Sequence, residues 1–444
     1  MAATEGDRDI KGINRISVRG FKSLYDECSI EIRPLTILAG ANSSGKSSIM
    51  QPLLLMKQTL EAPFDPGPLL LNGPYLKFTY SQQLFSRLSS KRPGSDSFDI
   101  KVAFGENLAV NSRFQSGYGK GENLPIEINS TVYEIKEEHF PLVIDSLNRE
   151  ASNVIPPSLK KLKDVYQNLS DSKTIQGIVK RNRCFLDLDA YMDGDFLKSI
   201  NLSSPLIKPI QEMIHVSGVR GNPERTYQTT TVKNQFPGAF DRYVASIIKN
   251  WQNEEDPRLL ELGNKLERLG LTWKIHAKQI NDVQIELEIG IPGYRGVNDT
   301  VNIADVGFGV SQTLPVLVAL LVAEPGQLVY LEQPEIHLHP RAQIALAEIL
   351  AEAADRGVRV VTETHSELLL VAIQSLVAEE KLSPDTVKLH WFSRGDDGVT
   401  KVSSADLDDA GAFGDWPEDF GEVSLKLDHR YLNAAEERLM ERSQ

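Results

Sequence analysis

The chain has 444 residues and a formal net charge of −13, a length that suits two or three domains or one domain with a large insertion. The acidic balance argues against a globally basic nucleic-acid binder but leaves room for a local basic patch. The two cysteines, Cys28 and Cys184, are too few for a disulfide framework and lack metal-site spacing. No apolar run approaches the ~20 residues of a membrane-spanning helix, and no signal peptide is recognisable. We therefore expect a soluble cytoplasmic protein without a membrane partner.

The first predicted elements are two short strands, residues 13–18 and 28–32, and a third apolar strand over 34–39. Directly after them, residues 40–47 read Gly-Ala-Asn-Ser-Ser-Gly-Lys-Ser and fit the pattern G-x-x-x-x-G-K-[ST] at every fixed position. The apolar segment that follows has helical length, although Pro52 falls within its first turns. The order strand, loop and helix predicts a phosphate-binding loop.

This loop predicts a site for a nucleoside triphosphate with Mg²⁺. Small residues let backbone N–H groups wrap the phosphates, and the helix N-terminus adds a favourable dipole. We expect Lys46 to reach the outer phosphates and the Ser47 hydroxyl to ligate Mg²⁺. The residues predicted to bind the nucleotide here are Asn42, Ser43, Ser44, Gly45, Lys46, Ser47 and Ser48.

The middle of the chain changes character twice. Residues 99–104 and 126–135 alternate like half-buried strands, and the glycine-rich stretch 115–122 between them is interpreted as a hairpin connection. From 141 to about 203 the pattern becomes helical and more charged, with basic clusters between 158 and 183. We interpret these clusters as a solvated helix face, with contact to nucleic acid or a partner protein as the alternative.

A loop is predicted over residues 214–227, because this stretch contains several glycines and Pro223. It carries Arg220 and Arg225, for which two interpretations stay open. These arginines contact phosphate or nucleic acid, or they form buried ion pairs that hold the loop. Helices and two alternating strands follow between 239 and 291.

The C-terminal third of the chain alternates helices and strands. A buried-type strand, 328–332, ends in Glu332, where a phosphate-loop ATPase carries its Mg²⁺-organising acid. The next strand, 358–364, ends at His365. Upstream, the sequence D-V-G-F-G-V-S-Q at 305–312 precedes an apolar helical segment.

The order of these motifs resembles the ABC-type ATPase heads. In this chain the motifs are the phosphate loop, V-G-F-G-V-S-Q, E-Q-P-E-I-H-L-H-P and E-T-H-S. The chain is most similar to the branch that includes the overcoming-lysogenization-defect (OLD) nucleases, RecF and the structural-maintenance-of-chromosomes (SMC) proteins. The opening I-S-V-R-G-F-K-S-L resembles the start of those heads, and the tail around 415–420 resembles a small domain of unknown function that follows such ATPases in bacteria. The resemblance covers residues 10–85 and 300–430.

The resemblance implies ATP as the nucleotide and assigns roles around its phosphates. It implies that Ser47 and Glu332 organise Mg²⁺, Glu332 standing where many relatives carry aspartate. It matches His365 to the switch histidine that senses the γ-phosphate. It also implies a glutamine that links Mg²⁺ to the lid, either Gln82 or Gln83, of which Gln83 is our choice.

The resemblance also implies a signature segment that caps ATP bound to the opposite subunit. Gly307 and Gly309 match this segment. Because Gly307 replaces the usual signature serine, backbone N–H groups, with help from Ser311, are expected to take its part.

One departure from the family pattern bears on the rate of hydrolysis. The position after the Walker B acid usually carries a glutamate that activates the attacking water, and here it is Gln333. An amide orients water but cannot take its proton, and general-base help typically contributes ~10²–10⁴-fold. Either Glu335 reaches the water, or hydrolysis is slow and ATP holds a closed state. We favour slow hydrolysis.

These inferences predict an α/β fold, an ABC-type P-loop NTPase head with a mixed β-sheet and a helical lid or insertion. Residues 1–140 are expected to form the first part of the head with the phosphate loop, and 141–235 the helical insertion. Residues 236–395 are expected to form its second part with the signature, Walker B acid and switch histidine, and 396–444 a small C-terminal domain.

The predicted function is that of an ATPase that dimerises around ATP. The resemblance implies a homodimer or a higher assembly of dimers. The stretch after His365 is too short for the nuclease domain of OLD proteins plus the tail. We therefore expect a sensor or scaffold that controls a separate effector, a nuclease or toxin, in anti-phage defence. The alternative is a RecF-like or SMC-like ATPase that binds DNA in repair or recombination.

Overall fold

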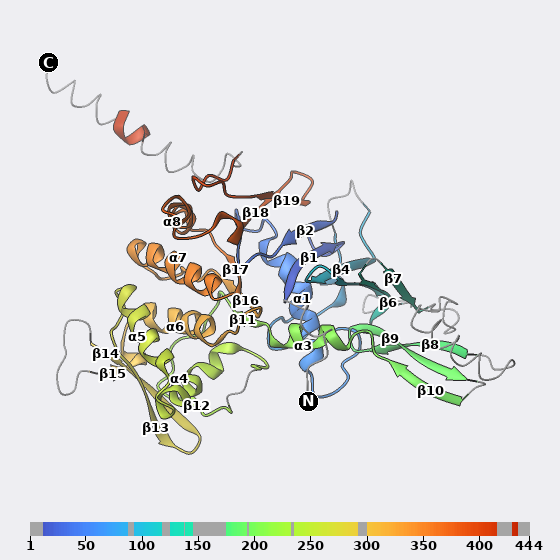
Figure 1. Ribbon diagram of the computed structural model, residues 1–444, viewed down its shortest axis with the longest axis horizontal. Helices are drawn as coiled ribbons and strands as arrows, with labels where there is room; N and C mark the ends of the chain where they lie inside the picture. The colour runs from blue at the N-terminus through green and yellow to red at the C-terminus, as the bar shows by residue number, and fades with distance from the viewer. Residues whose placement is uncertain are drawn as a thin grey trace.

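The computed structural model describes residues 12–87, 93–117, 125–136, 138–144, 175–192, 195–231, 235–291, 300–414 and 429–433. Its centre is a largely parallel sheet. Helices cover one face of this sheet, and a single long helix with an antiparallel sheet covers the other (Figure 1). The predicted α/β class with a phosphate-loop head is confirmed.

The central sheet has six strands in the spatial order β11-β16-β17-β3-β18-β19. Neighbouring strands are parallel from β11 to β18, and only β19 runs antiparallel to its neighbour. Because β17 lies between β3 and β16, the carboxyl ends of these three strands lie side by side, where open α/β sheets bind ligands. The strands are β3 (Leu35–Gly40), β11 (Ile214–Val216), β16 (Leu328–Glu332), β17 (Arg359–Glu363), β18 (Val387–Arg394) and β19 (Thr400–Ala405).

Side chains of the central strands alternate between two hydrophobic cores. On β16, Val329 and Leu331 pack with the helical lobe, whereas Leu328 and Tyr330 pack with the antiparallel sheet. Successive residues of a strand point to opposite faces. Because both faces are covered, these strands read as continuous apolar runs rather than as alternating ones.

The second core lies between α1 (Lys46–Glu61) and a six-stranded antiparallel sheet in the order β2-β1-β4-β5-β6-β7. The pairing of β5 with β6 confirms that the glycine-rich stretch joins two strands of a hairpin. Its residues from 118 onward lie outside the described part. The strands are β1 (Ile13–Arg19), β2 (Cys28–Glu31), β4 (Ser97–Phe104), β5 (Leu108–Ser116), β6 (Ile126–Ile135) and β7 (Glu138–Val143).

The helical lobe packs on the opposite face of the central sheet, together with a small sheet in which β14 pairs with β12, β13 and β15. Among the described helices, none combines the length and apolarity that crossing a bilayer requires. The helices of this lobe are α4 (Val244–Asn253), α5 (Pro257–Arg268), α6 (Phe308–Val322), α7 (Pro340–Asp355) and α8 (Glu367–Ala378). The strands are β12 (Tyr227–Gln228), β13 (Ile275–Asn281), β14 (Gln284–Gly290) and β15 (Thr300–Asn302). Within the described residues, the short 3₁₀ turns are η2 (Ser81–Gln83), η3 (Phe240–Tyr243), η4 (Ile303–Asp305) and η5 (Pro384–Thr386).

The helical insertion predicted for 141–235 is wrong over residues 175–200. These residues form three antiparallel strands, and the helix described within 141–235 is α3 (Ser204–Glu212). The many charges conceal a period-two pattern in which Leu186, Leu188 and Ala190 are buried. The strands are β8 (Ile175–Asn182), β9 (Phe185–Met192) and β10 (Asp195–Ile200).

This three-stranded sheet continues the β-rich lobe outward (Figure 1). The Tyr133 hydroxyl of β6 donates to the carbonyl of Leu186 at 2.7 Å and so fastens β9 to the antiparallel sheet. Of the predicted basic clusters, the lysines between 158 and 174 lie outside the described residues. The described cluster lies at the end of β8.

The C-terminal boundary predicted at 395/396 falls inside a hairpin. Strands β18 and β19 pair antiparallel on either side of it and close one edge of the central sheet. β19 also supports the phosphate loop, because the Thr400 hydroxyl donates to the carbonyl of Ser44 at 2.7 Å. The tail residues 415–420, on which the resemblance partly depends, lie outside the described residues.

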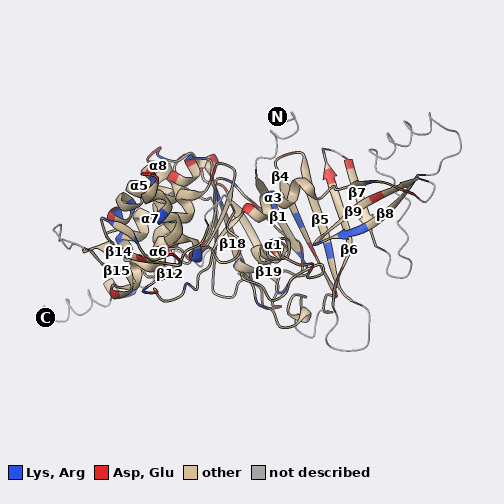
Figure 2. Cartoon of the chain, turned by 90° about the horizontal axis from the view of Figure 1, so that it is seen from below, with Lys and Arg blue, Asp and Glu red and all other residues tan. Residues whose placement is uncertain are grey.

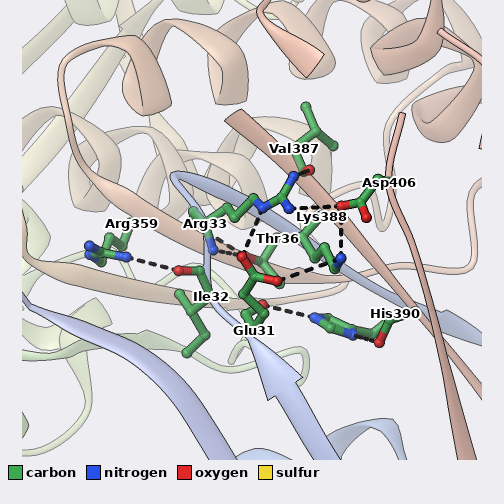
Figure 3. A network of polar contacts seen from close by, with 10 residues as sticks. Glu31, Ile32, Arg33, Thr36, Arg359, Val387, Lys388, His390 and Asp406 are labelled. Carbon is green, nitrogen blue, oxygen red and sulfur yellow. Dashed lines mark hydrogen bonds and ion pairs between the residues drawn. The ribbon is translucent and has the colours of Figure 1, made fainter. Parts of the chain in front are cut away.

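A polar network ties the connection between β2 and β3 to the β18–β19 hairpin (Figure 3). Arg33 contacts Glu31 at 3.0 Å and Asp406 at 2.8 Å. Lys388 contacts the same two acids, at 3.5 Å and 2.7 Å respectively. The two basic side chains thus hold the antiparallel sheet and the sheet edge together through shared carboxylates.

His390 is a deeply buried member of this network. Its Nε2 lies 2.8 Å from the carbonyl oxygen of Glu31, and its Nδ1 lies 2.7 Å from the Ser404 hydroxyl. A carbonyl oxygen only accepts hydrogen bonds, so Nε2 carries the proton and Nδ1 accepts from Ser404. Burial, with the nearby Lys388 charge, lowers the pKa of His390 to about 4.

We expect acidification to destabilise the fold through His390. In the unfolded chain this side chain takes up a proton below pH ~6.5, whereas the folded pKa is about 4. Stability is therefore lost as the pH falls between these values. Between pH 7.5 and 5 the parent should lose about 2 kcal/mol more unfolding free energy than His390→Gln, measured by urea denaturation. Parallel losses in the two proteins would contradict this.

Candidate nucleotide site

A cavity of about 900 Å³ opens at the carboxyl end of β3 and the start of α1. All seven predicted loop residues, 42–48, line it. The predicted order of strand, loop and helix is confirmed, with Pro52 inside α1. The other lining residues come from α1 and from five further parts of the chain: Lys22, Ser23, Gln51, Tyr80, Gln82, Gln83, Phe85, Arg87, Gln333, Glu363, His365 and Arg394.

Two glycines let the loop take its path. At Gly40 a Cβ atom would lie 2.2 Å from the carbonyl oxygen of Phe392 on the neighbouring strand. At Gly45, which has φ 105°, a Cβ atom would lie 2.5 Å from the Thr400 hydroxyl. Side chains are excluded at both positions, and the residues at the start of α1 line the cavity.

The cavity is suited to an anion. Lys46 is nearly buried, and its Nζ donates to the carbonyls of Gly40 and Ala41, at 2.8 Å each. Burial lowers the pKa of Lys46, while the charges of Glu363 and Glu335 oppose that shift. Lys22 lines the same cavity, and burial lowers its pKa to about 8. These ammonium groups and the helix N-terminus together favour phosphate.

The carboxylate next to Ser47 belongs to Glu363, a residue outside the predicted site. The Ser47 hydroxyl donates to Glu363 Oε2 at 2.7 Å, and the Tyr330 hydroxyl donates to Oε1. Burial raises the pKa of Glu363 to about 7, although both hydrogen bonds and the Lys46 charge oppose the rise. A hydroxyl and a carboxylate are hard oxygen donors of the kind that Mg²⁺ prefers, so the residues present fit this ion.

Glu332, the register partner of Glu363 on β16, binds a different part of the chain. Its Oε1 lies 3.0 Å from His215 Nε2, and its Oε2 accepts the N–H of Gly218 at 3.0 Å. Burial alone would raise the pKa of Glu332, but these bonds and the charge of Arg220 hold it below its usual range. Its part in organising Mg²⁺ stays a prediction, and the structure places Glu363, not Glu332, beside Ser47.

Gln333 and His365 both line the cavity, as the predicted roles require. The Gln333 N–H donates to the carbonyl of Glu363 at 2.9 Å, and its φ of 44° lies in the left-handed region. Burial lowers the pKa of His365, and the Lys46 charge adds to this effect. Both side chains therefore originate beside the phosphate loop.

Glu335 fastens the backbone that carries His365. Its Oε1 accepts from the Thr364 hydroxyl at 2.8 Å and from the His365 N–H at 3.0 Å. Its Oε2 is buried without a hydrogen-bond partner. Glu335 is not among the described residues that line the cavity. This position favours a structural role for Glu335 over the role of a general base.

Gln82 and Gln83, the two candidates for the lid glutamine, both line the cavity. The carboxamide oxygen of Gln83 accepts the backbone N–H groups of Thr79 and Tyr80, at 2.8 and 3.1 Å. These bonds hold the η2 turn at the cavity wall. The choice of Gln83 as a metal ligand stays a prediction.

The predicted signature residues lie at the start of α6, outside the described lining of the cavity. Gly307 caps the N-terminus of α6, Gly309 lies in its first turn, and the Ser311 hydroxyl donates to the carbonyl of Phe308 at 3.1 Å. None of the described residues that line the cavity comes from α6. The phosphate loop and the signature segment of one chain therefore do not meet in one pocket.

Arg220 joins these two regions. Its guanidinium donates to the carbonyls of Gln312 on α6 and of Glu332 on β16, at 2.9 Å each. Burial lowers its pKa to about 10. Arg225 instead pairs with Asp305, and both side chains are exposed. Among the described residues, Arg220 thus donates to backbone carbonyls and not to a carboxylate, and the sequence pattern does not reveal such contacts.

Comparison with known proteins identifies one family and several solved structures of low sequence identity. The family model described as AAA ATPase domain matches residues 12–370. The Smc head bound to the C-winged helix domain of ScpA is 14% identical at a TM-score of 0.49, covering 90% of this chain and 99% of that one. The SMC head domain from Thermotoga maritima is 12% identical at a TM-score of 0.42, covering 89% and 100%. Among curated proteins, no sequence matches.

Proposed function

The chain belongs to the family of AAA ATPase domains and is an ATPase, and we propose that it closes around ATP as an ABC-type homodimer. Nucleotide-dependent closure then controls a separate effector protein, a nuclease or toxin, in the manner of an anti-phage sensor or scaffold. Hydrolysis is slow, so that ATP holds the closed state. Mg²⁺ accompanies ATP and adds positive charge next to its phosphates.

One observation carries this proposal. The cavity contains the phosphate loop, Gln333 and His365, whereas Gly307 and Gly309 lie on α6 outside its described lining. A second copy that presented its α6 N-terminus to this cavity would complete the site. The backbone N–H groups at that N-terminus favour an anion such as the γ-phosphate.

Control of an effector is tested through nucleotide dependence. The tagged chain is purified with the protein that binds it in stoichiometric amounts, and that partner's nuclease activity or toxicity is measured with ATP, with ADP and with the Lys46→Ala chain. The proposal predicts that the partner's activity differs between ATP and the other two states. Equal activity in all three would refute effector control.

Direct DNA binding is the weaker alternative. Basic and acidic segments are interspersed on β8 and β9 (Figure 2). In the described basic cluster, Lys180 pairs with Asp189 at 2.6 Å and Arg181 pairs with Asp65 at 2.5 Å. These acids neutralise charges that phosphate contacts need. Salt-dependent binding of duplex DNA in the presence of ATP would reverse this ranking.

A further inference from the structure

Two carboxylates stand at the same level of neighbouring strands beside the phosphate loop. Glu332 ends β16 and Glu363 ends β17, and the two are register partners. β17 lies between β16 and β3, so its last residue is closer in the sheet order to the start of α1. Of these two glutamates, Glu363 lines the cavity and Glu332 does not, and Glu363 is 3% exposed.

The contacts of Glu363 are those expected of a residue that orients a metal ligand, here Ser47. The Ser47 hydroxyl has a single proton and donates it to Glu363, which leaves the lone pairs of its oxygen for a cation. The Tyr330 hydroxyl binds the other carboxylate oxygen and fixes its orientation. Partners that orient a ligand in this way tune its affinity for the metal.

Glu332 has both of its oxygens committed elsewhere. His215 contacts one oxygen and the Gly218 N–H donates to the other, at 3.0 Å each. The His215 ring in turn stacks on Tyr330, with 5.2 Å between ring centroids. Turning Glu332 toward Ser47 would leave the Gly218 N–H without this partner, at a cost that buried polar groups usually avoid.

We propose that Glu363 of β17, and not Glu332, is the acid that holds Ser47 in place for the Mg²⁺ of bound ATP. Glu332 instead anchors the loop that carries Gly218 and Arg220, and so fixes the link to α6. The Mg²⁺-organising carboxylate has thus moved by one strand. This inference rests on ATP and Mg²⁺ use alone, and neither dimerisation nor effector control is needed for it.

The test compares the same substitution at the two register partners. ATP affinity is measured by calorimetry in Mg²⁺ and in EDTA, at protein concentrations where the chain is monomeric, for the parent, Glu363→Gln and Glu332→Gln. The ratio of the two affinities gives the Mg²⁺-dependent gain. This ratio reports on ATP binding and not on turnover or assembly. The present proposal can therefore be refuted independently of the proposed function.

We expect the Mg²⁺-dependent gain of Glu363→Gln to be about tenfold smaller than that of the parent. This factor corresponds to the loss of one hydrogen bond to a charged group. Its ATP affinity in EDTA should stay equal or rise, because a negative charge next to the phosphates is removed. Glu332→Gln should keep the larger part of the gain. Equal losses in both variants, a larger loss in Glu332→Gln, or a parent without any gain would overturn the proposal.

A second pair of variants covers the case in which Glu363→Gln fails to fold. Glu363→Asp and Glu332→Asp keep the carboxylate charge and shorten the side chain by one methylene. The proposal predicts a greater loss of the Mg²⁺-dependent gain for Glu363→Asp than for Glu332→Asp. The reverse order, or no difference, would overturn it.

Discussion

Lys46→Ala should abolish ATP binding and, with it, nucleotide-dependent assembly. The nearly buried ammonium group lies in the phosphate loop, where it donates to the carbonyls of Gly40 and Ala41. Hydrogen bonds between charged groups contribute about 1.5–3 kcal/mol each, and two such bonds to phosphate imply at least a hundredfold loss of affinity. Calorimetric titration with ATP measures this loss.

A matched variant separates this effect from a general loss of positive charge. Lys101→Ala removes a lysine that pairs with Glu134 on the antiparallel sheet, away from the cavity. It should bind ATP like the parent. Thermal unfolding without nucleotide checks that both variants fold. ATP binding by Lys46→Ala at the affinity of the parent would contradict the assignment of the cavity.

Gln333→Glu should raise the turnover of ATP by about a hundredfold or more. A carboxylate in this position can take the proton of the attacking water, and general-base help contributes ~10²–10⁴-fold. The side chain starts beside the phosphates, because its N–H is bonded to the carbonyl of Glu363 and it lines the cavity. Phosphate release under saturating Mg²⁺ and ATP measures the rate.

The control places the same new charge elsewhere in the cavity. Gln51 lines the cavity on α1 and accepts a hydrogen bond from Lys22 at 2.5 Å. Gln51→Glu should leave the turnover within a few-fold of the parent, since it adds charge without a base next to the water. A parent that already turns over more than about 10 ATP per second would contradict slow hydrolysis.

The phosphate loop could be predicted from sequence because its function depends on local residues. A loop between a strand and a helix needs glycine at positions 40 and 45, and a lysine and a serine directly after them. All of these lie within one short segment. Their spacing is therefore enough to predict the geometry of the loop. The structure places each of the seven predicted residues in the cavity wall.

Glu363 could not be selected in this way, because its role depends on the order of strands. The sequence shows two strands that end in carboxylates, at Glu332 and Glu363, separated by α7. Only the register of β16 and β17, and the place of β17 next to β3, reveals which carboxylate meets Ser47. The signal that was available is a glutamate two residues before His365 at a strand end.

The strands at 175–200 and the role of Arg220 were missed for other reasons. The charges of β8 obscure the alternation of apolar residues in β9, and an amphipathic pattern with few apolar positions suits a helix as well as a strand. Arg220 binds backbone carbonyls. Because every residue has such an acceptor, no pattern of side chains predicts that contact.

The central claim is that two copies of the chain enclose ATP between them. Its most direct test is the molar mass in solution, measured by sedimentation equilibrium with Mg²⁺ and ATP, with ADP and without nucleotide. The account predicts a dimer with ATP and a smaller species in the other two conditions. A monomer that is saturated with ATP, or a mass that does not change with nucleotide, would contradict it.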